Sequence, residues 1–257
     1  MRYPADMHVH SAFSIDSDCT MEEQVKSAME KDIKTICFTE HYDLNPHDHG
    51  VGFYNYKAVS EEVKRLQDKY GDCVTILKGI EFSEPHLYPH EFETCTRFDY
   101  DYLLASIHFL GDFFILDKKM AATIQRESLS EQFYKETLRA VRFGGFDAIA
   151  HFDYIRRGMA SDVFDRDMLF EIFSEMVKQN ISLEINSQNL RRGIEFSFPS
   201  PEKVKLYAEA GGSRIVLGSD GHHKGDLGSG ITEALSACSD IPGLVPGMFV
   251  NRSFIPA

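Results

Sequence analysis

The chain has 257 residues, of which 43% are hydrophobic and 26% charged. This is the composition of an ordinary globular protein, so disorder is disfavoured. The formal net charge of −13 opposes the basic surface that binding to a phosphate backbone requires. A nucleic-acid scaffold is therefore disfavoured, whereas the length suits one domain and is typical of a (β/α) barrel.

The cysteine usage and the apolar runs bear on the cellular compartment. Five cysteines, an odd number, are far apart and form no CxxC pattern, which excludes a disulfide framework or a cysteine-rich zinc site as the first interpretation. No stretch of 18 consecutive apolar residues occurs, and the first residues lack the apolar core of a signal peptide. These features predict a reducing, cytoplasmic setting with no membrane contact.

Short apolar runs alternate with segments of helical periodicity along the whole chain. This alternation predicts an α/β protein with a parallel sheet whose strands are buried on both faces. Seven such strands with outer helices predict a (β/α) barrel one unit short of eight. The expected strands are Asp6 to His10, Ile33 to Thr39, Val74 to Glu81, Tyr102 to His108, Phe146 to His151, Ile181 to Asn186 and Arg214 to Asp220.

Helix start and stop signals lie between these runs. Thr20 and Glu23 form a capping-box pattern, Gly71 and Gly144 follow apolar-periodic segments, and Ser200-Pro201 reads as an N-cap with proline at the first helical position. The expected helices are Met21 to Asp32, Lys57 to Tyr70, Ser128 to Phe143, Asp165 to Asn180 and the segment from Pro201 to Gly211. No linker or repeat interrupts this order, so we predict one domain over residues 1–257.

Imidazoles and carboxylates stand at the ends of six of the seven expected strands. They are His8 and His10, His41 after Glu40, Glu81, His108, His151, and Asp220 with His222. The C-terminal ends of the strands in a βα barrel converge on one rim, where the catalytic groups gather. Because buried ionisable groups cost several kcal/mol unless they are paired or metal-bound, this joint pattern predicts a multinuclear metal site.

These residues resemble the motifs of the polymerase and histidinol phosphatase (PHP) superfamily. The matching blocks are Asp6-Met7-His8-Val9-His10 with Asp16 downstream, Glu40-His41, His108 with His151, and Asp220-Gly221-His222. The resemblance covers essentially the whole chain. It implies a distorted seven-stranded (β/α) barrel that carries three divalent transition metals.

The resemblance also implies three ligand sets. The first contains His8, His10, Glu81 and Asp220; the second shares Glu81 and adds His108 and His151; the third contains Asp16, His41 and His222. Asp220, His222 and Glu81 are expected to act directly in catalysis. This nitrogen and oxygen donor set suits zinc, manganese or iron(II) and disfavours calcium or copper(I).

Such a metal site implies hydrolysis of a phosphate ester. Closely spaced metals lower the pKa of a bridging water and neutralise charge on the phosphoryl oxygens. The GxSxG, HExxH and P-loop signatures are absent from the sequence. We therefore expect direct attack by a metal-bridging hydroxide, with no serine or cysteine nucleophile.

Two arginine pairs and two acidic residues are candidates for substrate binding. Arg156-Arg157 and Arg191-Arg192 follow neighbouring strands, and we expect one guanidinium of each pair to hold the phosphate. Asp43 and Glu84 are expected in loops over the site, where they would meet a cationic amine. His47 and His49 lie in a turn-forming context, which favours a solvated loop over a ligand pair.

The resemblance implies a phosphomonoesterase that acts on a small molecule. Within the superfamily, aspartate at position 16, where several members have histidine, favours the branch that hydrolyses L-histidinol phosphate to L-histidinol and phosphate in histidine biosynthesis. A broad-specificity phosphoesterase is the alternative. A non-catalytic interaction module and a nuclease are weaker hypotheses, because all ligand positions are filled and the chain is acidic. The sequence does not indicate an oligomeric state.

Overall fold

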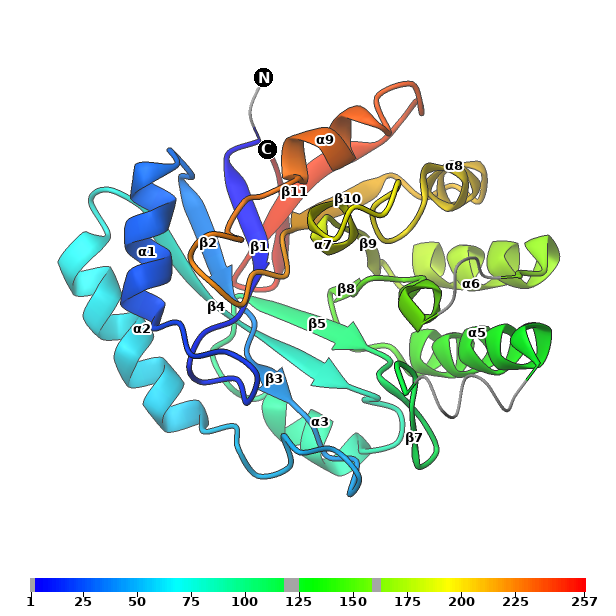
Figure 1. Cartoon of the computed structure of the whole chain (residues 1–257), viewed down its shortest axis with the longest axis horizontal. Coiled ribbons are helices and arrows are strands. Elements are labelled where there is room, and N and C mark those ends of the chain that lie inside the picture. The colour runs from blue at the N-terminus through cyan, green and yellow to red at the C-terminus, as the bar shows by residue number, and fades with distance from the viewer. Residues whose placement is uncertain (1–2, 118–124, 159–162) are drawn as a thin grey trace.

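A mostly parallel β-sheet organises the chain, as the computed structural model in Figure 1 shows. The structure describes residues 3–117, 125–158 and 163–257. Strands occupy the centre and helices cover the outside (Figure 1). The predicted α/β class is confirmed.

All seven expected strands are present, each within a few residues of its predicted bounds. They are β1 (Ala5–Val9), β2 (Thr35–Phe38), β4 (Thr75–Ser83), β5 (Tyr102–Ser106), β8 (Ala148–Ile149), β9 (Ser182–Asn186) and β10 (Arg214–Gly218). They pair in parallel in the order of the chain. Because the strands are parallel, all their C-terminal ends lie at the same edge of the sheet.

The sheet is larger than the seven strands that the sequence predicted. The additional strands are β3 (His41–Tyr42), which pairs with β4, and β11 (Val245–Val250) and β12 (Ser253–Pro256), which extend the sheet beyond β10. β11 contains Pro246 and Gly247, residue types that are rare within strands, so its sequence gave no clear strand signal. A separate hairpin pairs β6 (Phe109–Leu110) with β7 (Phe113–Phe114).

The five predicted helices also form, and several short ones appear beside them. The predicted helices are α1 (Met21–Glu30), α2 (Tyr56–Tyr70), α5 (Arg126–Phe143), α6 (Arg166–Lys178) and α8 (Pro201–Glu209). The short ones are α3 (Pro89–Cys95), α7 (Gln188–Arg191), α9 (Ile231–Ser236) and the 3₁₀ helix η1 (Tyr154–Gly158). These last elements are too short to show a helical period in sequence.

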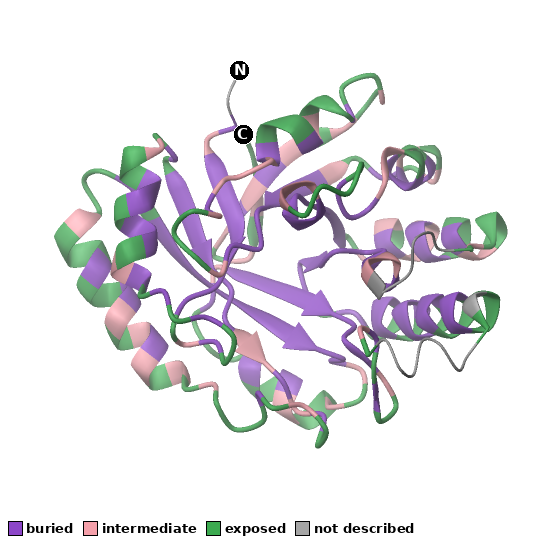
Figure 2. Cartoon of the chain, viewed as in Figure 1, coloured by how far each residue is buried: buried purple, intermediate pink, exposed green. Residues whose placement is uncertain are grey.

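The seven predicted strands are almost wholly buried, whereas the long helices are buried on one face only (Figure 2). In Figure 1, α1 and α2 lie side by side at one flank of the sheet, and α5, α6 and α8 at the other. The Thr20 hydroxyl accepts a hydrogen bond from the Glu23 backbone N–H, and the Glu23 carboxylate accepts from the Thr20 N–H. This capping box fixes where α1 begins.

Backbone hydrogen bonds join the end of β1 to the segment that follows β10. The Asp220 N–H donates to the His8 carbonyl at 2.8 Å, and the His10 N–H donates to the Gly221 carbonyl at 2.9 Å. β10 pairs with β11 through Arg214, Ile215 and Val216. The first strand therefore lies beside β10, and these backbone hydrogen bonds join the two where the candidate ligand motifs lie.

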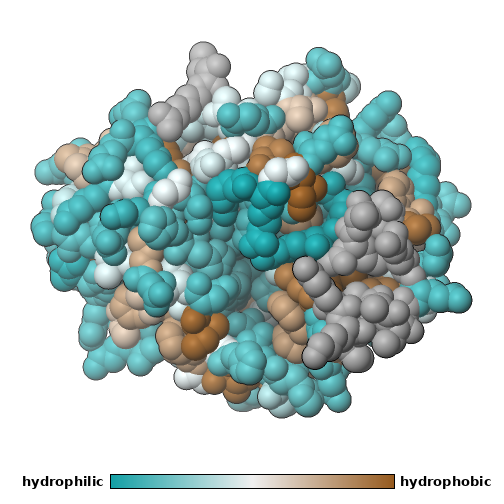
Figure 3. Space-filling model, viewed as in Figure 1, coloured by the Kyte–Doolittle hydropathy of each residue, from teal (hydrophilic) through white to brown (hydrophobic). Residues whose placement is uncertain are grey.

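The face of the molecule seen in Figure 3 is mostly hydrophilic, with separate hydrophobic patches. Among the described residues, no helix has both the length and the apolar character needed to cross a bilayer.

Leu66 tests how much the packing of α2 against the sheet contributes to stability. Its side chain is fully buried in a cluster with Val25, Ile36 and Ile76. Leu66→Ala is expected to lower the free energy of unfolding by about 2–5 kcal/mol, through lost burial and a residual cavity. Urea denaturation followed by circular dichroism measures this loss. Lys64→Ala, at an exposed position on the same helix, is the control and should change stability by less than about 0.5 kcal/mol.

Candidate metal centre

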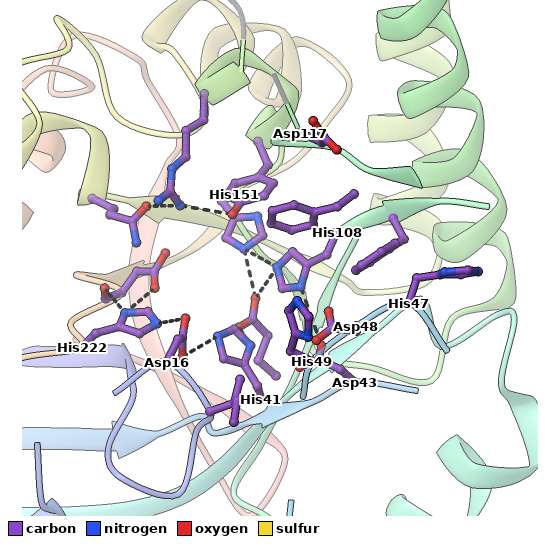
Figure 4. A pocket seen from close by; sticks show the side chains of 18 residues that line it. Asp16, His41, Asp43, His47, Asp48, His49, His108, Asp117, His151 and His222 are labelled. Carbon is purple, nitrogen blue, oxygen red and sulfur yellow. Dashed lines mark hydrogen bonds and ion pairs between the residues drawn. The ribbon is translucent and has the colours of Figure 1, made fainter. Parts of the chain in front are cut away.

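A cavity of about 580 Å³ opens at the C-terminal ends of the parallel strands. Figure 4 shows its polar side chains pointing toward one another from different strands and loops. The cavity is lined by Ile15, Asp16, His41, Asp43, His47, Asp48, His49, Glu81, His108, Phe109, Phe114, Asp117, His151, Tyr154, Arg157, Gln188, Asp220 and His222. Apart from His8 and His10, which lie beneath it, every residue predicted to bind metal lines this cavity.

The first predicted ligand set comes together at the end of β1. His8 and His10 project to the same side, with their Nε2 atoms 2.9 Å apart. Asp220 Oδ1 lies 3.9 Å from His8 Nε2 and 3.5 Å from His10 Nε2. Glu81 Oε2 lies 3.4 Å and 3.5 Å from the same two nitrogens. All four side chains thus face one point.

The second set is built on the other oxygen of the same carboxylate. Glu81 Oε1 lies 3.0 Å from His151 Nε2 and 3.5 Å from His108 Nε2. The two imidazole nitrogens are 3.4 Å from each other. Each oxygen of Glu81 therefore faces a different group of imidazoles, which is the geometry of a carboxylate that bridges two cations.

The third set is nearer to solvent than the first two. Asp16 lies between His41 and His222 (Figure 4), with its oxygens 3.6 Å from His41 Nε2 and 3.0 Å from His222 Nε2. The side chains of Asp16, His222 and His41 are 52%, 23% and 13% exposed, while Glu81 is 1% exposed. His10 stacks on both His41 and His222, so this set adjoins the first.

Hydrogen bonds to Nδ1 fix the orientation of the imidazoles at β1. His8 Nδ1 donates to Glu184 Oε1 at 2.6 Å. His10 Nδ1 lies 3.1 Å from the Ser14 hydroxyl, which itself donates to Glu40, so the Ser14 oxygen accepts from His10. Both rings then present Nε2 as an electron-pair donor toward the other members of their set.

The same arrangement recurs at two other histidines. The Ser83 hydroxyl donates to Asp43 Oδ1 at 2.5 Å and accepts from His108 Nδ1 at 3.0 Å. His222 Nδ1 donates to the carbonyl of Asp220 at 3.1 Å. In the neutral imidazoles, the Nε2 atoms of His108 and His222 then face carboxylate oxygens as electron-pair donors, an arrangement that a cation between them stabilises.

The electrostatics of the cluster favour bound positive charge. Burial lowers the pKa of His8, but Glu184, Glu81 and Asp220 outweigh this effect and raise it well above its ordinary value. Burial also lowers the pKa of His108, yet hydrogen bonds to Asp43 and Glu81 raise it to about 10. Glu81 Oε2 is buried without a hydrogen bond from any described residue. The donor set, its negative field and this carboxylate oxygen all fit divalent metal ions.

Three of the seven described residues other than glycine with a positive φ lie at or beside these clusters. His151, Asp220 and Glu84 have φ values of 25°, 53° and 48°, in a region that residues other than glycine rarely adopt. Gly218 is required for a different reason. A Cβ on it would lie 2.3 Å from the His8 Cβ and 2.7 Å from Glu184 Oε1. The backbone is thus shaped around the ligand clusters.

Of the four arginines predicted as candidates for the phosphate clamp, only Arg157 lines the cavity among the described residues. Arg157 lines the cavity and donates to the Tyr154 hydroxyl and to Gln188 Oε1. Arg156 instead donates to the Ser197 carbonyl and lies over the Phe198 ring. Arg191 donates to the backbone carbonyls of Ser219 and Asp220.

Arg192 is exposed and, like Arg156 and Arg191, does not line the cavity as the described residues form it. The expectation of one clamp residue from each pair is therefore wrong for the second pair. Tertiary contacts with backbone carbonyls, which the sequence does not show, turn Arg156 and Arg191 away from the cavity.

The two predicted acidic residues are not flexible loop groups. Glu84 is fully buried, and its carboxylate accepts from the backbone N–H groups of His108 and Phe109 at 2.6 and 3.0 Å. Burial raises its pKa to about 7. Glu84 does not line the cavity within the described residues, so its expected contact with substrate is a wrong prediction. Asp43 does line the cavity, but it is held by Ser83 beside His108.

Several residues of the site were missed by sequence reasoning. Glu184 is the most important of these, because its second oxygen also accepts from the His151 N–H at 2.7 Å. The sequence feature that could have identified it is a carboxylate between Leu183 and Ile185 within a predicted strand. Tyr154, whose ring centre lies 4.3 Å from that of His151, and Gln188 gave no signal of their own. His47 is half-exposed, as predicted for a loop, yet it lines the cavity mouth.

The fold and the site together define a class of α/β protein, in which candidate metal-ligand clusters lie at the C-terminal ends of a mostly parallel sheet. Residues 6–188 match the model of the PHP domain family, which is well over half of the chain. The chain belongs to this family, and the predicted resemblance is confirmed.

Relatives and solved structures carry related names. A probable histidinol-phosphatase of Clostridium acetobutylicum is 27% identical over 255 residues, covering 96% of this chain and 97% of that protein. A histidinol-phosphatase of Lactococcus lactis is 28% identical over 237 residues, covering 84% of this chain and 83% of that protein. A crystal structure of histidinol phosphate phosphatase from Lactococcus lactis, complexed with zinc, L-histidinol and phosphate, matches the fold with a TM-score of 0.87 at 24% identity, covering 99% of this chain and 100% of that one.

Glu184 provides a direct test of how His8 is oriented. In Glu184→Gln the amide retains the size of the side chain, but it loses the charge and turns an NH₂ group toward either His8 Nδ1 or the His151 N–H. Metal affinity is expected to fall about 10- to 100-fold. Calorimetric titration of the metal-free protein with Zn²⁺ measures this fall. Glu202→Gln, at an exposed position on α8, is the matched control, and an equal affinity in the two variants would refute the role of Glu184.

Proposed function

We propose that this protein is a metal-dependent phosphomonoesterase that hydrolyses L-histidinol phosphate to L-histidinol and phosphate. One observation carries the proposal: the two oxygens of Glu81 face separate groups of imidazole nitrogens at the floor of an open cavity. The names of the relatives and of the solved structure from Lactococcus lactis support the choice of substrate. The same names support a biosynthetic role in the histidine pathway. The five scattered cysteines, all of them free, support a cytoplasmic location.

The proposed centre holds three divalent transition metal ions, zinc, manganese or iron. His8, His10, Glu81 and Asp220 would hold one, Glu81 with His108 and His151 a second, and Asp16, His41 and His222 a third. Such ions supply a water of lowered pKa and neutralise charge on the phosphoryl oxygens. The neighbouring carboxylates keep the site from carrying excess positive charge.

The residues of the chain itself orient the ester. Asp220, His222 and Glu81 line the cavity and would place the reacting phosphate beside the metals. Arg157 presents a guanidinium held by Tyr154 and Gln188, and the ring of Tyr154 packs on His151. A guanidinium fixed next to a ligand of the second set is suited to bind a phosphoryl oxygen and to stabilise its charge in the transition state.

The cavity also has an end suited to a cation. Figure 4 shows Asp48, His49 and His47 on the side away from His222. Asp48 lies near Asp43, and its burial raises the pKa of its carboxyl, with Asp43 contributing in the same direction. Phe109 and Phe114 line the cavity too. A protonated amine and an aromatic imidazole fit this surrounding, so Asp48 replaces Glu84 as the proposed amine contact.

We further propose that the sheet curls into a distorted barrel that forms one domain over residues 1–257. The backbone hydrogen bonds between β1 and the segment after β10 support closure at the end that carries the site. A broad-specificity phosphoesterase remains the alternative function, because a cavity of about 580 Å³ has room for other small phosphate esters.

The substrate assignment is tested by phosphate release from the zinc- or manganese-loaded protein. We expect kcat/KM for L-histidinol phosphate to exceed that for an uncharged alkyl phosphate on the order of 10³-fold, because binding energy from the amine and the imidazole helps position the phosphate. Asp48→Asn should narrow this gap about tenfold and leave the alkyl phosphate unaffected. Comparable rates on the two esters in the unaltered protein would favour the broad phosphoesterase.

Arg157 is expected to act on turnover and not on metal binding. Arg157→Ala should reduce kcat/KM for L-histidinol phosphate about 10²-fold, equivalent to about 2.7 kcal/mol of transition-state stabilisation. Elemental analysis should show unchanged metal content. Arg142→Ala, on the exposed surface of α5, serves as the control. Wild-type kinetics in Arg157→Ala would mean that the metals alone hold the phosphate.

A further inference from the structure

Side chains from the loop before α1, from α1 and from Lys31 directly after it bind the backbone of residues 221–227, which we call the segment of His222. Ser17 donates to the His222 carbonyl at 2.7 Å, and Ser27 donates to the Lys224 carbonyl at 2.7 Å. Gln24 donates to the carbonyls of His10 and Gly221 at 3.0 and 3.2 Å. Together with Lys31, these residues form what we call the clasp: Ser17, Gln24, Ser27 and Lys31.

Lys31 makes the most extensive contact of the clasp. Its ammonium donates to the carbonyls of Lys224, Gly225 and Leu227 at 3.0, 2.9 and 2.9 Å. An ammonium group has three N–H donors, so one carbonyl is available for each. Three carbonyl oxygens turned toward one point repel one another, and the positive charge between them removes this repulsion. Lys31 therefore fixes a tight turn directly after His222.

Three residues of the clasp are aligned along α1. Gln24 and Ser27 lie in the helix and Lys31 directly follows it, and their spacing of three and four residues places them in one row. Gln24 and Ser27 are buried, and Leu227 packs into the apolar cluster of Val25 and Ala28. The helix thus binds the segment by apolar packing and by donors in the same row.

The segment needs this external support because it lies beyond the end of the sheet. β10 ends at Gly218, and only short backbone contacts link residues 220 and 221 to β1. The side chains of Asp16 and His222 are 52% and 23% exposed, while the ligands of the other two sets are buried. Asp16 and His222 are therefore the candidate ligands whose positions depend most on contacts made outside the sheet.

We propose that Lys31 is a positioning residue for His222 and that the clasp sets the metal affinity of the set formed by Asp16, His41 and His222. This inference rests on the metal centre of the proposed function. It makes Lys31, which lies directly after α1 and is not itself a candidate ligand, a determinant of how many metals the protein retains. The other two sets are held by buried strand ends and do not depend on Lys31.

Zinc binding tests the inference in the full-length protein. Metal-free wild type and Lys31→Met are titrated with Zn²⁺ by calorimetry, and zinc retained after dialysis is measured by elemental analysis. We expect the weakest zinc of Lys31→Met to bind about 10- to 100-fold less tightly, with the two tighter zincs unchanged. Lys26→Met is the matched control, because Lys26 lies on α1, is 55% exposed and pairs with Glu22 instead of the segment.

Two further measurements separate positioning from a general structural role. Lys31→Arg keeps a charged donor and should recover most of the weakest-site affinity. Trypsin should cleave after Lys224 faster in metal-free Lys31→Met than in Lys26→Met, because the Lys224 carbonyl loses one of its two hydrogen bonds. Ser27→Ala removes the other bond and should weaken the same zinc by a smaller factor, which keeps the test available if Lys31→Met folds poorly.

Different results would contradict the inference about Lys31 and the proposed function. Equal zinc affinities in Lys31→Met and Lys26→Met would overturn the inference, and so would a uniform loss of all zincs in both Lys31→Met and Ser27→Ala. Failure of the proposed function would appear elsewhere, as a wild-type protein that retains zinc but releases no phosphate from L-histidinol phosphate. The zinc measurements do not use activity, so the two hypotheses fail separately.

Discussion

Glu81 is surrounded by imidazoles, and the rest of the structure follows from keeping this buried carboxylate in place. Its oxygens lie 3.0–3.5 Å from nitrogens of His8, His10, His41, His108 and His151. A buried carboxylate among these nitrogens is stable only when positive charge lies close to it. Its negative charge raises the pKa of His8, His41 and His108, so the cluster favours bound positive charge, either as protons on the imidazoles or as metal ions.

The surrounding hydrogen bonds hold the imidazole rings of the candidate ligands in one orientation. Glu184, Ser14, Ser83 and the Asp220 carbonyl each bind a Nδ1 atom, and the carboxylates of Glu40 and Asp43 orient the two serines. Such partners are part of a metal site in the physical sense, because ligand orientation is settled before a metal binds. Gly218 and the strained φ of Asp220 show that the backbone accommodates the same geometry.

The sheet holds the first two candidate ligand sets in place, and contacts around α1 help to hold the third. Strand ends carry the first two ligand sets, where both faces of the sheet are covered and the side chains are buried. In the third set His41 begins β3, while Asp16 and His222 lie in loops, and side chains from α1 and from the residues on either side of it hold the loop of His222. Groups near solvent are thereby positioned by a helix, while Arg157 and Asp48 remain accessible in the cavity.

Sequence reasoning located the strands and the candidate ligands because both follow local rules. An apolar run that ends in His-x-His or Asp-x-His shows its period and its reactive groups within a few residues, and parallel strands bring such ends together. It failed for β11, where Pro246 and Gly247 interrupt the pattern. It also failed for Glu84, whose loop position suggested exposure while backbone N–H groups of His108 and Phe109 bind it inside the protein.

The sequence by itself determined the α/β class, the strand order and the residues that converge at the strand ends, because these depend on periodicity and on residue type. Only the tertiary structure decided which arginine reaches the cavity, that Glu184 orients His8, and that Lys31 holds the segment of His222. The partners are 31 positions apart for Arg157 and Gln188, 176 for His8 and Glu184, and 196 for Lys31 and Leu227. Across such separations, the packing of the folded chain decides which side chains meet. No local pattern encodes it.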